Sequence, residues 1–150
     1  MRWGVRLATA GEVRDWDALV QRNPDGGQWT QGSAFAALKS TEGLTPRYLV
    51  FEGPSRVHAL ALEHRSLAGR FWYLPLGPGA EIHDLPGIAD ALRRERRGVA
   101  RGVYAVKLEP FVVDEPAHRG VLADAGLRAS AGIQRNVHTG LVDLEPDEDA

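Results

Sequence analysis

One stretch decides how this chain folds: Phe71-Trp72-Tyr73-Leu74-Pro75-Leu76-Gly77-Pro78-Gly79. Its aromatic first half is typical of a strand. Pro75 should end that strand, because proline lacks the N–H that a sheet ladder needs, and the glycines allow unusual dihedral angles. The sequence therefore predicts a gap in main-chain pairing at the strand end, flanked by the phenol of Tyr73 and the carboxylate of Glu81. An ordinary exit from strand to loop is the simpler alternative.

The segments around this stretch predict one α/β domain. The elements expected before it are a strand at 3–7, a helix from a Thr9–Glu12 capping box to about residue 20, a helix from about Ser33 to Gly43, and three meandering strands at about 47–51, 56–64 and 70–74. The elements expected after it are a helix at 84–97, a strand at 103–109, a short helix at 116–125, and extended segments at 127–130 and 134–144. We expect residues 1–144 to form a single domain and the acidic residues 145–150 to be frayed.

The composition narrows the class of protein. The chain has 150 residues, 43% hydrophobic and 25% charged, with a net charge of −2, which is typical of one soluble domain and disfavours nucleic-acid binding through bulk charge. It has no cysteine, which excludes disulfides, a thiolate nucleophile and cysteine zinc sites. We find no signal-peptide pattern and no apolar run long enough for a membrane span. This favours a cytoplasmic location, with any contact at the inner face of the membrane being peripheral.

The candidate metal ligands do not form a complete set. His58 and His64 lie six residues apart on one expected strand, too far to chelate one ion together. The pattern Asp114-Glu115-x2-His118 has suitable ligand types but too few of them. We therefore predict no metal site.

The order of the expected elements resembles the fold of the Gcn5-related N-acetyltransferases (GNAT). The resemblance implies a mixed, mostly antiparallel sheet with helices on both faces, splayed between its fourth and fifth strands, here 70–74 and 103–109. Reactants enter the splay in that fold, so the Gly-Pro loop after Tyr73 would lie at its mouth.

Five local patterns also resemble one family, the Fem-type aminoacyltransferases that add the first cross-bridge residues to peptidoglycan precursors. They are Gln31-x3-Phe35-x3-Lys39, Tyr73-x-Pro75-x-Gly77-Pro78, Lys107-Leu108-Glu109-Pro110, Leu122-x3-Gly126-Leu127-x2-Ser130 and Ile133-Gln134-x4-Thr139-x3-Asp143-Leu144. Each is weak alone, but their order and spacing extend over nearly the whole chain. Members of the family carry two acyltransferase-like subdomains, so the resemblance covers the first and implies a fragment or truncated form, whose activity alone is open.

The resemblance also implies roles for particular side chains. Glu81 would orient or accept a proton from the attacking amine as the catalytic carboxylate. Lys39 would contact the diphosphate of the precursor, and Tyr73, Gly77 and Pro78 would line the substrate cleft. Two positions depart from the family: Leu76 stands where a basic residue is common, and Gly79 where a β-branched residue is common.

The implied activity is transfer of an amino acid from aminoacyl-tRNA to the stem peptide of a muramyl-pentapeptide precursor, a step of cell-wall synthesis that affects cell shape. The ester is already activated, so no cofactor is expected, and the enzyme would act mainly by positioning the amine and stabilising the oxyanion. The expected partners are the nucleotide-linked or lipid-linked precursor and aminoacyl-tRNA. Peripheral membrane contact, self-association and pairing with a second subdomain remain open.

Two alternatives use the same fold. An acyl-CoA N-acetyltransferase would need a Gln/Arg-x-x-Gly-x-Gly/Ala loop at a helix start, and the nearest candidate, Glu95 to Ala100, has an acid at the key position and lies at a helix end. A non-catalytic module would retain only binding of the precursor or a partner. In that case a cluster of arginines could contact tRNA or anionic lipid, although such a cluster is more often a solvated helix end: Arg93, Arg94, Arg96, Arg97 and Arg101.

Overall fold

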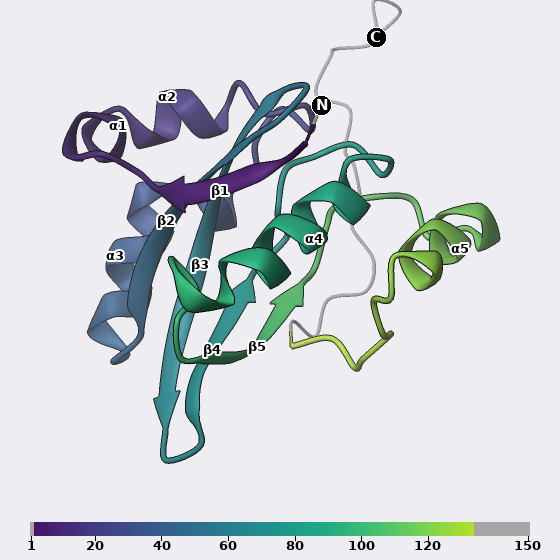
Figure 1. Ribbon diagram of the computed structural model, residues 1–150. Coiled ribbons are helices and arrows are strands. Elements are labelled where there is room, and N and C mark those ends of the chain that lie inside the picture. Colours follow the sequence, from purple (N-terminus) through teal and green to yellow (C-terminus); the bar gives the residue numbers. More distant parts are fainter. Residues whose placement is uncertain (1, 134–150) are drawn as a thin grey trace, which may run out of the picture.

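The computed structural model describes residues 2–133, which form a five-stranded mixed sheet flanked by helices (Figure 1). The strands lie in sequence order, β1-β2-β3-β4-β5. They are β1 (Gly4–Leu7), β2 (Thr45–Glu52), β3 (Arg56–Ser66), β4 (Gly69–Leu74) and β5 (Val103–Leu108). The first four pair antiparallel, and only β5 runs parallel to its neighbour, β4. The predicted mixed, mostly antiparallel sheet is confirmed.

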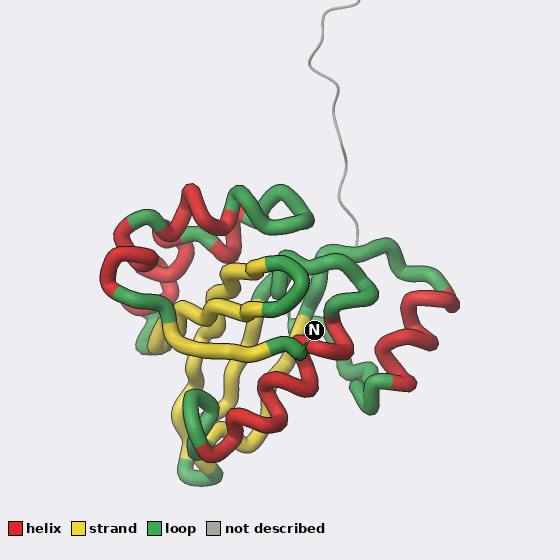
Figure 2. Tube along the Cα trace, turned by 45° about the horizontal axis from the view of Figure 1, so that its top comes forward, coloured by secondary structure: helices red, strands yellow, loops and turns green. Residues whose placement is uncertain are grey.

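The helices cover both faces of this sheet, as predicted (Figures 1 and 2). On one face lie α1 (Ala10–Arg14), α2 (Trp16–Val20), the 3-10 turn η1 (Trp29–Gln31) and α3 (Ser33–Thr41). On the other lies α4 (Leu85–Arg94), which continues into the turn η2 (Glu95–Arg97), while α5 (Pro116–Asp124) follows β5. Across residues 2–133, no helix combines the length and apolarity that crossing a bilayer requires.

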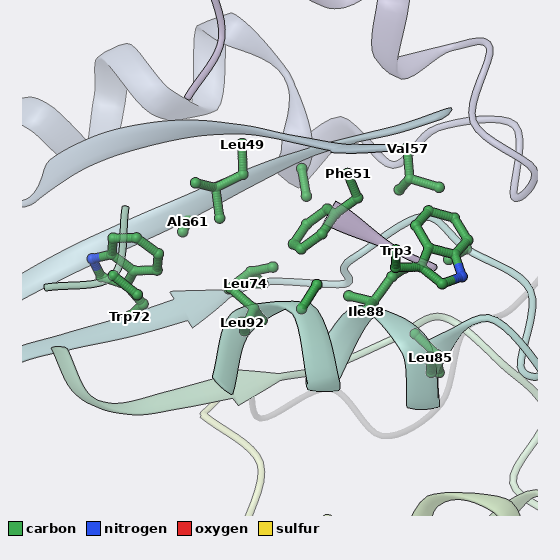
Figure 3. Packing of buried hydrophobic residues seen from close by; sticks show 14 residues of the cluster. Trp3, Leu49, Phe51, Val57, Ala61, Trp72, Leu74, Leu85, Ile88 and Leu92 are labelled. Atoms are coloured by element: carbon green, nitrogen blue, oxygen red, sulfur yellow. The ribbon is translucent and has the colours of Figure 1, made fainter. Parts of the chain in front are cut away.

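The main hydrophobic core lies between the sheet and α4 (Figure 3). Alternate residues of β2, β3 and β4, among them Phe51 and Trp72, point toward Leu85, Ile88 and Leu92 of α4. This side of α4 is apolar because its buried residues recur at helical spacing. A smaller cluster on the opposite face joins Phe35 and Ala36 of α3 to Leu60, Leu62 and Tyr73 of the sheet. Both faces of β3 are therefore covered, as its continuous apolar run indicates.

The amino-terminal helix differs from the prediction. The Thr9–Glu12 capping box is present, but the helix breaks at Asp15, whose backbone (φ −95°, ψ 15°) leaves the helical region, so α1 and α2 are separate. Of the residues in these two helices, Trp16 and Val20 are buried. Residues 127–130 form no strand, and the expected extended segment 134–144 and frayed end 145–150 lie outside the described residues.

The place where the sheet opens also differs from the prediction. Strands β4 and β5 are paired from Arg70 with Val103 to Leu74 with Leu108, with one shift of register after Arg70, so they do not splay. The amide of Glu109 even extends the contact by donating to the carbonyls of Leu74 and Gly77. The sheet instead opens between β3 and β4. They pair only from Leu62 to Ser66 on β3, because Pro75 turns the chain away. Residues 56–61 of β3 are therefore paired with β2 on one side, while on the other side no strand among residues 2–133 lies beside them.

Candidate functional site

Side chains fill the opening between β3 and β4, and the most important is Gln31 at the end of η1. Its amide group acts as a short piece of strand: Oε1 accepts from the N–H of Leu60 (2.8 Å), and Nε2 donates to the carbonyls of Leu60 (3.3 Å) and Pro75 (2.6 Å). The hydroxyl of Thr30 also donates to the Pro75 carbonyl, at 3.0 Å. Gln31 is completely buried, so the opening is closed to water at this level.

The side-chain amide of Asn23 also pairs with the backbone of β3, at His58, two residues before Leu60. This side chain accepts from the N–H of His58 (2.9 Å) and donates to the His58 carbonyl (2.7 Å). The imidazole of His58 is buried and stands edge-to-face with Trp16, and neither ring nitrogen has a hydrogen-bond partner among residues 2–133. Burial lowers the pKa of His58, and the nearby Glu12 carboxylate opposes that shift only in part.

The Gly-Pro corner is packed against this plug and does not form an open slot. Leu76 adopts a left-handed conformation (φ 45°) and the Gly77–Pro78 peptide is cis. A Cβ at Gly77 would lie 2.7 Å from the Gln31 side chain, and one at Gly79 would collide with Asn23 and Asp25. Gly77 and Pro78 are both buried. The expected main-chain slot at the strand end is therefore filled in this structure, and the two glycines are required for close packing.

Tyr73 lies near the carboxyl end of β4, where its hydroxyl donates a hydrogen bond to Oε2 of Glu109. The other oxygen, Oε1, accepts from the N–H of Ile133 (2.8 Å) and lies 4.0 Å from Nζ of Lys107. Lys107 also donates to Oγ of Ser130 at 2.8 Å and to the carbonyl of Ala131. Since β4 and β5 are parallel and Tyr73 is in register with Lys107, the strand ends bring a phenol, a carboxylate and an ammonium together.

Lys107 and Glu109 border a large open groove. The groove has a volume of about 1520 Å³ and runs beside β5, between α4, α5 and the segment 126–133. Lys107 and Glu109 contribute to its wall, and their side chains are 13% and 17% exposed, whereas Tyr73 is 5% exposed behind them. A ligand in the groove would thus meet Glu109 and Lys107 first.

The other predicted site residues lie apart from this group. Lys39 is on α3, where Nζ binds Glu42 (2.7 Å) and lies 5.4 Å from the centre of the Phe35 ring. Glu81 is exposed in the loop before α4, with its backbone carbonyl accepting from the N–H of Asp84. Within residues 2–133, no three His, Cys, Asp or Glu side chains are close enough to hold a metal ion.

Sequence reasoning missed Glu109 as a site residue, although the pattern Lys107-Leu108-Glu109-Pro110 was recognised. The available signal was its place directly after β5, the strand that runs parallel to the one carrying Tyr73. Polar residues at the carboxyl ends of neighbouring parallel strands converge. The Tyr73–Glu109 contact joins residues 36 positions apart, so no local pattern reveals it.

Comparison with known proteins gives one informative likeness. No protein-family model matches the sequence, and no curated protein is significantly similar to it. The crystal structure of FemX matches 81% of this chain with a TM-score of 0.62 and 22% identity, and the chain spans about a third (31%) of the length of FemX. A second solved structure comes from Agrobacterium tumefaciens str. C58, and acetyltransferase is its assigned name only. It covers 89% of this chain and 99% of its own length at 18% identity, with a TM-score of 0.43. The FemX match shows that this chain shares the fold of part of FemX, as the sequence predicted.

Proposed function

We propose that this chain is the first acyltransferase-like subdomain of an aminoacyltransferase that extends the stem peptide of a peptidoglycan precursor, with aminoacyl-tRNA as donor. The observation that carries the proposal is the likeness to FemX over four fifths of the chain. The five sequence patterns of the family, in order, give independent support. The coarser conclusion, an acyltransferase-like fold, does not depend on this choice of substrates.

The group of Tyr73, Lys107 and Glu109 supplies what the reaction needs. The amine nitrogen attacks the ester carbonyl, the bond to the ribose oxygen breaks, and the proton lost by the amine ends on that oxygen. A carboxylate held by a phenol and a backbone N–H can accept a hydrogen bond from the amine and orient it. The ammonium of Lys107, in the same groove wall, can donate to the developing oxyanion. Glu109 is therefore a second candidate for the role that the sequence gave to Glu81.

The same geometry disfavours an acyl-CoA N-acetyltransferase. Residues 95–100 form the turn that ends α4, and the amides of Gly98 and Ala100 already bind the carbonyl of Glu95. The loop before α4 has the spacing Gly77-x-Gly79, but Leu74 stands at the Gln/Arg position and Pro78 has no N–H. The amides of Gly77 and Ala80 bind carbonyls within the loop. Neither segment offers the cradle of free amides that a pyrophosphate requires.

A thermal-shift experiment on this chain tests the proposal. A muramyl-pentapeptide nucleotide at about 100 times its dissociation constant should stabilise the fold by about 2.7 kcal/mol, which raises the melting temperature by about 5–10 °C for a chain of this size. Acetyl-CoA should cause no shift. Stabilisation by acetyl-CoA alone would overturn the proposal in favour of an N-acetyltransferase.

A transfer assay with aminoacyl-tRNA separates catalysis from binding and the two carboxylates from each other. We expect Glu109→Gln to reduce transfer at least about 100-fold, the usual effect of losing a group that acts on the reacting atoms, and Glu81→Gln to have a smaller effect. Asp124→Asn, at an exposed carboxylate at the end of α5, is the matched control. If the chain binds precursor but transfers nothing even when supplied with the rest of the protein, it is a non-catalytic module.

A further inference from the structure

A buried carboxylate holds three arginines at the end of the sheet where β3 turns into β4. Glu63 is 1% exposed and faces the α4 side of the sheet. Arg47 binds it through two nitrogens (2.9 and 3.2 Å), Arg65 through Nε (3.2 Å) and Arg70 through Nη1 (3.3 Å). The indole of Trp72 adds a fifth hydrogen bond at 2.8 Å. All three guanidinium groups therefore pair with the same carboxylate.

This cluster has an excess of positive charge. Burial opposes ionisation of Glu63, but the hydrogen bonds from Arg47 and Trp72 and the charges of Arg47 and Arg70 outweigh it, lowering the pKa to about 2. Glu63 is ionised at neutral pH and balances one of three positive charges. Among residues 2–133, it is the acid with which these arginines pair. Arg65 is 67% exposed, and its terminal nitrogens, like Nη2 of Arg70, have no protein acceptor in the part of the chain described.

The turn next to this cluster carries an exposed apolar side chain. Leu67 lies in the two-residue turn between β3 and β4 and is fully exposed. The hairpin projects past the end of α4, so this turn forms one extremity of the molecule (Figure 1). Tyr104, at the start of β5 and 59% exposed, lies beside Gly69 and packs its ring against Phe71 (6.2 Å between centres). Leucine, tyrosine and arginine thus lie together at this end of the sheet.

We propose that this end of the sheet, defined by Arg47, Arg65, Leu67, Arg70 and Tyr104 and called here the hairpin patch, docks peripherally on an anionic phospholipid surface. Basic side chains near such a surface each contribute to binding through attraction to the headgroups. An apolar side chain adjacent to them inserts below the headgroups, and a tyrosine sits at the boundary between the two. The inference is independent of the chemistry of acyl transfer and adds a location to it.

The same charges could contact the phosphates of RNA, but the apolar component favours lipid. A phosphodiester backbone is bound through basic and hydrogen-bonding groups and gains nothing from a leucine that projects beyond them. At a bilayer interface, by contrast, the arginines are attracted to anionic headgroups and the leucine is buried below them. The preorganisation by Glu63 also suits a flat array of phosphates, because the arginines lose little freedom on binding.

Vesicle cosedimentation tests the proposal with the intact chain. We expect binding to vesicles of phosphatidylcholine containing about one third phosphatidylglycerol, weak binding to pure phosphatidylcholine, and a decrease with salt as screening shortens the range of attraction. Arg65→Gln should lower the partition coefficient about fivefold, and Leu67→Ser should lower it by a similar or larger factor because its apolar insertion is lost. Leu67→Trp should raise it.

Two matched variants control for charge and apolarity elsewhere on the surface. Arg22→Gln, after α2, and Leu38→Ser, on the exposed side of α3, should bind vesicles like the original chain. All four side chains are exposed, so thermal melts should agree within a few degrees. The proposal is overturned if anionic vesicles do not bind the chain, if the hairpin variants bind as well as the controls, or if Arg65→Gln impairs only the binding of tRNA added in place of vesicles.

Discussion

Replacing Gln31 by alanine should cost this protein more than any other single change of a polar side chain in the α2–α3 loop. Gln31 is completely buried and makes three hydrogen bonds that close the sheet between β3 and the exit of β4. Truncation leaves both the N–H and the carbonyl of Leu60 without partners. The Pro75 carbonyl keeps its bond from Thr30.

The expected loss follows from these two orphaned groups. Each buried polar group left unpaired costs about 1–3 kcal/mol, so the two groups together should lower the free energy of unfolding of Gln31→Ala by about 2–6 kcal/mol. For a chain of this size that corresponds to a fall of about 10 °C in melting temperature. Gln31→Met, which preserves most of the volume, should still lose about 2 kcal/mol, because the polar partners remain unsatisfied.

Urea denaturation followed by circular dichroism measures the free energy of unfolding, whose slope with urea concentration should be unchanged, and a thermal melt measures the melting temperature. Gln28→Ala is the control. Gln28 precedes the same turn, its side chain makes no hydrogen bond within residues 2–133, and its loss should change stability by less than about 0.5 kcal/mol. A loss below about 1 kcal/mol for Gln31→Ala would refute the reasoning, since water would then have replaced the side chain at no cost.

Three further outcomes follow from the charges and the candidate site. The pKa of Glu63 is lowered to about 2 in the fold, so its ionised form contributes about 3 kcal/mol to the free energy of unfolding. This contribution is fully present above about pH 4.5 and is lost as the pH falls toward 2. Glu63→Gln should therefore flatten the acid side of a plot of stability against pH. Burial also lowers the pKa of His58, so stability should decline as the pH falls below about 6.5, and melts of His58→Phe should show no such decline. Lys39→Ala and Tyr73→Phe should each weaken binding of the muramyl precursor, measured by calorimetry, while the melting temperature changes by only a few degrees; a variant that unfolds would instead reveal a structural role.

The local signals in the sequence were sufficient for most of the fold. Pro75 does end β4, the Thr9–Glu12 box does begin α1, and the apolar spacing of Leu85, Ile88 and Leu92 does define the buried face of α4. These features depend on residues a few positions apart, which a single sequence displays directly.

The site could be predicted only in part, because its contacts join distant segments. Tyr73 was identified from the strand that carries it, but its partner Glu109 comes from another strand. The predicted position of the opening in the sheet, between β4 and β5, was wrong for the same reason. Nothing near Gln31 or Asn23 in the sequence indicates that their amides pair with β3, 29 and 35 residues away. Whether Lys39 and Glu81 contact a substrate stays a prediction.

The side-chain amides of Asn23 and Gln31 take the place of a strand beside β3. The sequence changes that the loop carrying them can accept are therefore limited by the geometry of the sheet. Asn23 and Gln31, eight residues apart in the chain, must reach His58 and Leu60 together, and these two partners are two residues apart on β3, so they face the same edge of the strand. Inserting or deleting residues between Asn23 and Gln31 would move one of the two amides away from its backbone partner on β3. The residues between the two amides should therefore tolerate changes of their exposed side chains but not of their number, and the amide protons of His58 and Leu60 should exchange as slowly as those inside a continuous ladder.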